Sequence, residues 1–196
     1  MKGHGLLEGK VVVVTAAAGT GIGGAAARRC LEEGAQVAIS DQHHKRLAAT
    51  RDELAAGHGD RVWSLGCDVT DEAQVAALID GAAGHFGRID VMINNAGLGG
   101  TASMLDMTDE QWSRVLDVTL TGTFRCTRAA LRQMVAQGHG GAVLGDSGQR
   151  KVGEEDRRGI GHFVSLFALF HVFIGNGLRK IFWVNSDSIY VPNFHN

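Results

Sequence analysis

The sequence predicts an α/β fold in which helices cover both faces of a doubly wound parallel sheet. Apolar runs rich in β-branched residues alternate with helical patterns of ten or more residues between residues 10 and 144. Strands and helices that alternate at this length are joined by right-handed crossovers, which make neighbouring strands parallel. A glycine-rich segment, residues 19–24, joins the first apolar run to the first helical pattern. The expected architecture is Rossmann-like, and it is incomplete at the C-terminal edge because the alternation stops near residue 146.

Each expected strand is a short apolar run bounded by small or polar residues. Residues 11–14 are four consecutive valines, a pattern typical of a strand that is buried on both faces of a parallel sheet. The expected strands are residues 10–15, 36–40, 61–66, 89–94 and 142–144. The expected helices are a segment that follows residue 24 and ends at residue 33, then residues 43–56 and 71–86, and a long helix from residue 109.

The long helix has its own start signal. The hydroxyl of Thr108 can accept a hydrogen bond from the free N–H groups of the first turn, which makes Thr108 a candidate cap. Apolar residues then follow at helical spacing, and they form the predicted apolar stripe of this helix: Trp112, Val115, Leu116, Leu120, Phe124 and Leu131.

Length and composition indicate a single domain followed by a tail. The 196 residues are 44% hydrophobic and 20% charged, which is typical of a globular domain. Eight of the twelve aromatic residues fall in the last 38 positions, after a charged run at 150–158. We therefore expect a Rossmann-like domain at residues 1–147 and an aromatic-rich tail at residues 148–196, which is not a separate domain.

Two explanations of the tail stay open. Residues from about 145 onward can belong to a truncated or out-of-frame product that never evolved to pack on this sheet. Alternatively, the tail is a replacement segment that covers the sheet edge with one helix face, formed by residues at spacings of four and three: Phe163, Phe167, Phe170 and Phe173.

Charge and cysteine content exclude several classes of protein. A net charge of -2 provides no basic field for nucleic acid or for an anionic membrane. Cys30, Cys67 and Cys126 lie far apart without a CxxC pair, which argues against a disulfide framework and against a metal site. The N-terminus lacks the apolar region of a secretory signal. We expect a cytoplasmic protein with a small-molecule substrate and with no nucleic-acid or membrane partner.

The glycine-rich segment carries the clearest chemical signal. It reads Gly-Thr-Gly-Ile-Gly-Gly and contains GxGxxG at Gly19, Gly21 and Gly24. Between a strand and a helix, such glycines permit a tight turn, close approach of a pyrophosphate to the backbone and close helix packing, while the helix N-terminus presents free N–H groups. A plain glycine-rich connector is the alternative. The predicted diphosphate site consists of Gly19, Thr20, Gly21, Ile22 and Gly23.

Asp41 is the expected partner of this loop. It stands at the end of the second strand, 17 residues after Gly24, close to the spacing of about 20 that is typical of a carboxylate bound to an adenosine ribose. A carboxylate at this position repels a 2'-phosphate, so Asp41 favours NAD. The basic residues at 43–46 keep NADP as the alternative. A solvated strand end is the other interpretation of Asp41.

Three segments together resemble the short-chain dehydrogenase/reductase family: residues 14–23, the pair Asp68-Val69, and residues 94–97 with the sequence Asn-Asn-Ala-Gly. The resemblance covers about residues 7–147, and residues 112–124 are similar to the long interface helix of the family. It implies an NAD(P)-dependent oxidoreductase of ketones and secondary alcohols, commonly a homotetramer. In such an enzyme Asp68 and Val69 flank the adenine, and Asn94, Asn95, Ala96 and Gly97 line the cofactor cleft. Alternatively, Asn94 and Asn95 only cap backbone groups at a strand end.

The glycine loop departs slightly from the family pattern. It has one residue more than the common Thr-Gly-x-x-x-Gly-x-Gly form, and Ala16 replaces the first glycine. This variant resembles reductases of bacterial steroid-ring breakdown, so a ring or steroid-derived ketone is the expected substrate.

The catalytic part of the family pattern is missing after the fifth strand. Family members transfer a proton with a tyrosine that a lysine four residues later activates, and a serine about a dozen residues earlier orients the carbonyl. Ser147 matches that serine. The sequence contains no YxxxK, and its single tyrosine is Tyr190. Other residues occupy the family positions: Ile160 or Gly161 for the tyrosine, Val164 or Ser165 for the lysine, and Thr119 for a further asparagine.

Two functions therefore stay open. The first is an oxidoreductase of this family that uses NAD, with NADP as the alternative, and whose activity is impaired by the missing tyrosine and lysine. The second is a non-catalytic dinucleotide-binding or interaction module, or a truncated inactive product. A methyltransferase on a similar sheet would explain the glycines and Asp41, but it gives no reason for the Asn-Asn-Ala-Gly run.

Overall fold

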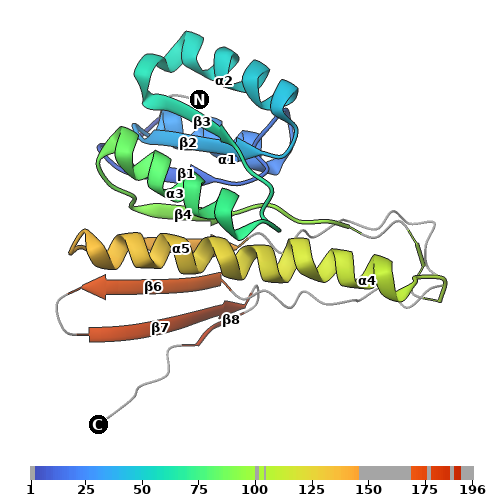
Figure 1. Cartoon of the computed structure of the whole chain (residues 1–196). Coiled ribbons are helices and arrows are strands. Elements are labelled where there is room, and N and C mark those ends of the chain that lie inside the picture. Colours follow the sequence, from blue (N-terminus) through green and yellow to red (C-terminus); the bar gives the residue numbers. More distant parts are fainter. Residues whose placement is uncertain are drawn as a thin grey trace.

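The computed structural model describes residues 3–99, 102–103 and 105–145, and the backbone of three further strands at 169–175, 178–185 and 188–190. Five parallel strands form the main sheet in the order β3-β2-β1-β4-β5, as Figure 1 shows. This arrangement confirms the predicted α/β fold. The strands are β1 (Val11–Val14), β2 (Gln36–Asp41), β3 (Val62–Gly66), β4 (Val91–Asn94) and β5 (Ala142–Gly145).

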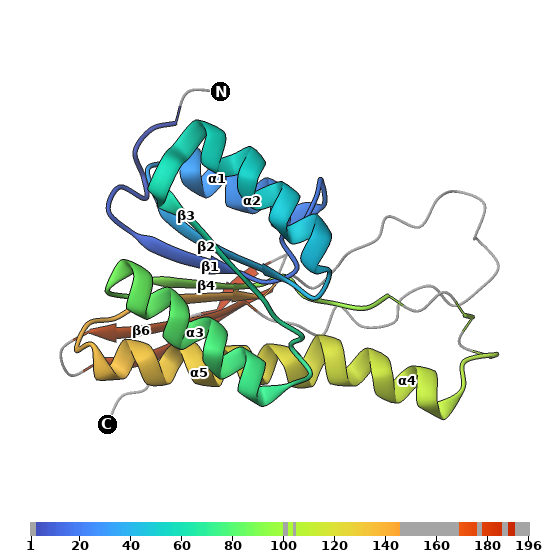
Figure 2. The same ribbon diagram turned by 45° about the horizontal axis from the view of Figure 1, so that its top comes forward.

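Helices cover both faces of this sheet. Helices α1 and α2 lie on one face, and α3 and α5 lie on the other, as the two views in Figures 1 and 2 agree. The helices, including a short 3-10 turn (η1) and a π-helical segment (η2), are α1 (Ile22–Glu32), α2 (His44–His58), η1 (Gly59–Arg61), α3 (Glu72–Phe86), α4 (Asp109–Leu116), η2 (Asp117–Thr121) and α5 (Gly122–Ala136). Each predicted helix and each of the five predicted strands is therefore present, with ends that differ by at most three residues.

The valine run of β1 lies at the centre of the molecule. All four valines are completely buried. Successive side chains of a strand point to opposite faces, so Val13 packs with the α3 and α5 side while Val12 and Val14 pack with the α1 and α2 side. Strand β1 pairs with β2 on one edge and with β4 on the other. The four-valine run is thus the strand with neighbours on both edges and on both faces.

The long helix is continuous but contains the π-helical segment η2. Thr108 caps it as predicted, and the Gln111 side chain returns a hydrogen bond to the Thr108 N–H to complete a capping box. The predicted stripe is wrong for Leu120 and Phe124, whose exposed fractions are 42% and 55%. A π turn takes one residue more than an α turn, so it displaces the later residues around the helix axis. The face of α5 that is buried instead consists of Gly122, Cys126, Ala130 and Met134.

The remaining strands form an antiparallel sheet, β6-β7-β8, in which β6 (Leu169–Gly175) pairs with β7 (Leu178–Asn185) and β7 pairs with β8 (Ser188–Tyr190). Strand β6 lies beside β5. The helical interpretation of the phenylalanine spacing is therefore wrong for Phe170 and Phe173, which lie in a strand. Only Asn176 and Gly177 separate β6 from β7, and Asn-Gly is the dipeptide that most favours a two-residue hairpin.

Several predictions concern residues outside the described part of the chain. These are Ser147, the domain boundary at residue 147, and the positions where the family tyrosine and lysine were expected, at 160–161 and 164–165.

Candidate functional site: a nucleotide site at the carboxyl ends of the strands

The candidate site lies where β1, β2 and β4 end. The chain leaves β1 toward β2 on one side of the sheet, while β4 lies on the other side, so the strand order reverses between β1 and β4. In open α/β sheets, ligands bind in the crevice outside the carboxyl ends of the strands at such a point. The predicted cofactor residues all lie at or after these strand ends or that of β3.

The residues after β4 hold the loop that follows β1. The hydroxyl oxygen of Thr15 accepts hydrogen bonds from the N–H groups of Asn95 and Ala96, each at 3.0 Å. The side-chain amide of Asn95 donates to the carbonyl oxygens of Thr15 and Ala16, at 3.0 and 2.9 Å. Asn95 thus caps backbone groups, as the alternative interpretation stated, and in doing so it connects the Asn-Asn-Ala-Gly run to the glycine loop.

Two residues of this loop adopt left-handed backbone conformations. Ala16 has φ +50° and Gly19 has φ +87°. An L-residue with a Cβ is strained there, whereas glycine is not. The alanine that replaces the family's first glycine therefore takes the conformation that glycine favours.

The glycines that follow meet different demands. A Cβ at Gly23 would come within 2.7 Å of the Ala16 carbonyl oxygen and closer still to the Asn95 amide nitrogen, and a Cβ at Gly24 would collide with the Gly19 carbonyl oxygen. No protein atom of the described chain lies within 4 Å of a Cβ placed at Gly21. Gly24 therefore packs closely against Gly19 of the same loop, and Gly23 packs closely against Asn95.

The N-terminus of α1 provides a cradle that fits a diphosphate. Gly21 is the N-cap residue and supplies no side-chain cap, and Thr20, Gly21 and Ile22 are exposed. Within the described residues, no protein acceptor takes a hydrogen bond from the N–H groups of residues 20–23. Free N–H groups and the positive end of the helix dipole favour an anion at this position.

Asp41 is fixed beside the loop by both of its carboxylate oxygens. Oδ2 accepts from the Ala18 N–H at 3.2 Å, and Oδ1 accepts from the His43 N–H at 2.8 Å. The residue is only 7% exposed. A carboxylate offers about four acceptor positions, so two N–H donors leave room for the hydroxyl groups of a sugar. The Arg46 guanidinium lies 4.0 Å from Oδ1 and is largely exposed.

A cavity of about 380 Å³ continues from Asp41 across the strand ends. It brings together five predicted cofactor residues, namely Asp41, Asp68, Val69, Ala96 and Gly97. Gly19 to Gly23 are not among its lining residues. Ala16 and Arg46, which the sequence placed in the glycine loop and in the basic group after Asp41, also line it. Sequence reasoning missed the other lining residues: Gln42, Cys67, Thr70, Leu98, Arg114, Asp117 and Val118.

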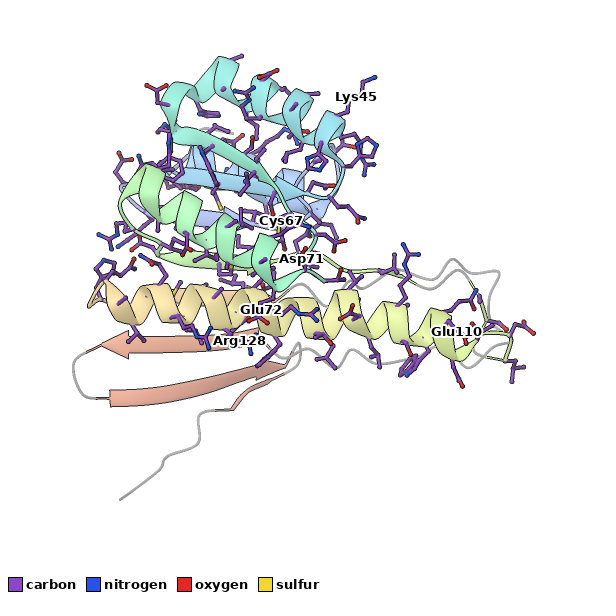
Figure 3. All side chains as sticks on the ribbon, in the orientation of Figure 1. Lys45, Cys67, Asp71, Glu72, Glu110 and Arg128 are labelled. Atoms are coloured by element: carbon purple, nitrogen blue, oxygen red, sulfur yellow. The ribbon has the colours of Figure 1, made fainter. Side chains whose placement is uncertain are left out.

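The wall of the cavity near β3 contains a buried thiol. Cys67 is 3% exposed, and Figure 3 shows it between the sheet and α3. Burial raises the pKa of the Cys67 thiol to about 12, with a further contribution from the negative charges of Asp68 and Asp71. Burial likewise raises the pKa of Cys126 to about 12. Neither thiol is therefore a nucleophile at neutral pH.

Helix α5 is fixed to the opposite side of the site. The Thr119 hydroxyl, in the π-helical segment, accepts the Leu98 N–H at 3.1 Å. Thr119 thus holds the loop after β4 at the position where the family has an asparagine. The Asn94 amide donates to the Thr127 hydroxyl at 3.0 Å, and Arg128 pairs with Glu72 of α3, as Figure 3 shows. In the described chain, the buried Asn94 Oδ1 accepts no hydrogen bond.

A family model described as short chain dehydrogenase matches residues 10–155. The chain belongs to the short-chain dehydrogenase family. The matched range contains the glycine loop, Asp41 and the Asn-Asn-Ala-Gly run, and the resemblance predicted from the sequence is confirmed.

Several members of this family are similar over most of the chain. The "(5R,7aS)-5-hydroxy-7a-methyl-1-oxo-2,3,5,6,7,7a-hexahydro-1H-indene-carboxyl-CoA reductase" of Mycobacterium tuberculosis is 59% identical over 145 residues, which are 74% of this chain and 55% of the relative. The NADP-dependent mannitol dehydrogenase of Alternaria alternata is 42% identical over 63% of this chain and 47% of its own length. A short chain dehydrogenase structure from Mycobacterium smegmatis has a TM-score of 0.71 at 56% identity, covering 76% of this chain and 63% of that one. The chain spans about half the length of these curated family members.

Two kinds of feature are absent from the described residues: a membrane-spanning helix and a metal-binding cluster. No described helix combines the length and the apolar character that crossing a bilayer requires. The same residues contain no group of three or more histidines, cysteines or carboxylates placed to hold a metal ion.

Proposed function

We propose that the chain binds NAD at the carboxyl ends of β1, β2 and β4, as the cofactor-binding part of a short-chain dehydrogenase/reductase. The observation that supports this most is the Asp41 carboxylate, held between the glycine loop and a cavity of about 380 Å³. The diphosphate would lie on the N-terminus of α1, the ribose against Asp41, and the adenine between Asp68, Val69 and the chain after β4.

Asp41 supports NAD over NADP. A 2'-phosphate would lie against a carboxylate that is buried and already fixed by two N–H groups, and this like-charge contact is unfavourable. Arg46 is the residue that could offset it, but its guanidinium is exposed and lies at the limit of ion-pair distance from Asp41.

The reaction we propose for the family site is hydride transfer between a nicotinamide and a ring ketone or secondary alcohol. NAD would supply the hydride chemistry. The substrate class rests on the 59% identical relative, which is named as a reductase of an oxo-hexahydroindene carboxyl-CoA. The residues of this chain would bind and orient the cofactor.

A second candidate, a module that binds NAD without turnover, rests on the missing YxxxK motif. The family tyrosine and lysine provide the proton at the substrate oxygen, and general acid-base catalysis contributes about 10² to 10⁴-fold in rate. Neither residue type stands at the expected positions. We therefore expect this chain to bind NAD and to show no measurable hydride transfer by itself.

Calorimetric titration with NAD and NADP tests the binding proposal. We expect wild-type protein to bind NAD more tightly than NADP, and Asp41→Asn to weaken NAD binding about tenfold while it strengthens NADP binding. NADH oxidation with a panel of ring ketones tests turnover. Oxidation well above the uncatalysed rate would refute the second candidate, and a wild-type protein that binds neither dinucleotide would refute the first.

We also propose that the protein works in the cytoplasm. NAD is found there, and cysteines such as Cys30, Cys67 and Cys126 stay as free thiols in that compartment.

We further propose that the long helix mediates self-association. Phe124 of α5 and Leu120 of η2 are exposed to solvent, and the Arg128 guanidinium carbon lies over the Phe124 ring, 4.6 Å from its centroid. Analytical ultracentrifugation of wild-type protein and Phe124→Ser tests the association.

A further inference from the structure

The peptide groups on either side of Gly19 are held by two helices. The Gly19 N–H donates to the Thr50 hydroxyl at 2.8 Å, and the Gly19 carbonyl oxygen accepts from Nη1 of Arg28 at 3.3 Å. The second terminal nitrogen of Arg28 pairs with Glu53 at 2.9 Å. We call the set formed by Gly19, Arg28, Thr50 and Glu53 the loop bracket.

The bracket connects α2 to the glycine loop. Thr50 and Glu53 are three residues apart on α2 and so lie on one face of that helix, while Arg28 comes from α1. Thr50 is 4% exposed, and the Arg28 side chain is 29% exposed. A hydrogen bond to the buried Thr50 hydroxyl is shielded from water, so its loss would leave the Gly19 N–H without an equivalent partner.

The bracket acts next to the Asp41 contact. Ala18 and Gly19 are consecutive, and their N–H groups donate to Asp41 and to Thr50 respectively. Asp41 in turn accepts the N–H of His43, which caps the start of α2. The N-cap residue of α2 therefore holds the Asp41 carboxylate, and Thr50, two turns later, holds the glycine loop.

Holding Gly19 determines the direction of the groups that follow it. Gly19 has φ +87°, and a Cβ at Gly24 would strike its carbonyl oxygen, so the peptide has little room to rotate. With the N–H and the carbonyl of Gly19 both hydrogen-bonded, the chain that enters residues 20–22 is held in place. These three residues are exposed, and within the described chain their N–H groups have no protein acceptor, so an anion can approach them. Groups fixed before binding lose less conformational entropy on binding.

We propose that Thr50 and Arg28 are positioning residues that set the affinity of the glycine loop for a diphosphate, without touching the ligand. This inference rests on the proposed function. It gives Thr50 and Arg28, which are not residues of the predicted diphosphate site, control over diphosphate affinity but not over adenosine affinity.

Titration with three probes tests this role: adenosine, AMP and ADP-ribose. Thr50→Val keeps the size of the side chain but removes the acceptor, so we expect ADP-ribose affinity to fall about tenfold and adenosine affinity to stay within about twofold. Thr50→Ser retains a hydroxyl and should restore ADP-ribose binding. Thr108→Val, which removes a threonine hydroxyl at the distant start of α4, is the matched control and should change neither affinity.

Arg28→Gln provides a second variant in case Thr50→Val does not fold, and it should also weaken ADP-ribose binding selectively. Amide exchange at Gly19, measured by NMR without ligand, should accelerate in Thr50→Val. Unchanged ADP-ribose affinity in both variants, or an equal loss for adenosine, overturns the positioning role while the proposed function stands. A folded wild-type protein that binds none of the three probes overturns the proposed function, and the positioning role with it.

Discussion

Replacing Gly23 by alanine tests the contact between the glycine loop and the Asn-Asn-Ala-Gly run. The new Cβ would meet the Ala16 carbonyl oxygen at 2.7 Å and the Asn95 amide nitrogen, and Asn95 holds the loop through two hydrogen bonds, to Thr15 and Ala16. Overpacking costs about 1–3 kcal/mol, and the two hydrogen bonds are worth about 1 kcal/mol each. The higher helix propensity of alanine returns about 1 kcal/mol.

The expected net effect of Gly23→Ala is a loss of about 2–4 kcal/mol in the free energy of unfolding. Urea unfolding followed by circular dichroism measures it, and the midpoint should fall by about 1–2 M for a slope near 2 kcal/mol/M. Gly84→Ala is the matched control, because Gly84 also lies inside a helix but no described atom lies within 4 Å of its Cβ position. That variant should gain up to about 1 kcal/mol. If Gly23→Ala is as stable as Gly84→Ala, the tight contact does not exist.

Three further outcomes follow from single groups. Thr108→Ala removes the cap of α4 and should lower the free energy of unfolding, measured by thermal denaturation, by about 0.5–2 kcal/mol. A loss no larger than that caused by an alanine substitution at an ordinary exposed position would contradict the capping box. Because burial raises the pKa values of Cys67 and Cys126 to about 12, iodoacetamide at pH 8 should label both far more slowly in native protein than in urea. The Leu6 N–H lowers the pKa of Glu33, so the stability that Glu33 adds should be complete above about pH 5 and fade as the pH falls below 4. A melting-temperature difference between wild type and Glu33→Gln that does not change with pH would refute this.

Most of the fold could be predicted from local sequence signals. Four adjacent valines, a GxGxxG segment and the Thr108 cap each act over a few residues, so the strand, the turn and the helix start are visible in the sequence. The pairing of β6 with β7 also has a local signal in the sequence, the dipeptide Asn176-Gly177.

The parts that could not be predicted depend on distant contacts. The π-helical segment at Asp117–Thr121 has no local signature, so the exposure of Leu120 and Phe124 could not be foreseen. Arg114 of α4 and Asp117 of η2 line the same cavity as residues 41–70, which lie more than forty positions earlier in the chain. Thr50 was similarly hidden, since nothing in its own neighbourhood indicates that its hydroxyl meets Gly19.

The start of the glycine loop is held rigid by strand β1. The glycine loop begins one residue after β1, which is completely buried and hydrogen-bonded along both edges. Loosening the start of the loop means breaking the backbone ladder in the middle of the sheet, an event close to global unfolding. A nucleotide bound to the loop would slow amide exchange in β1, β2 and β4 together. Binding at a few exposed residues would therefore stabilise the buried centre of the sheet.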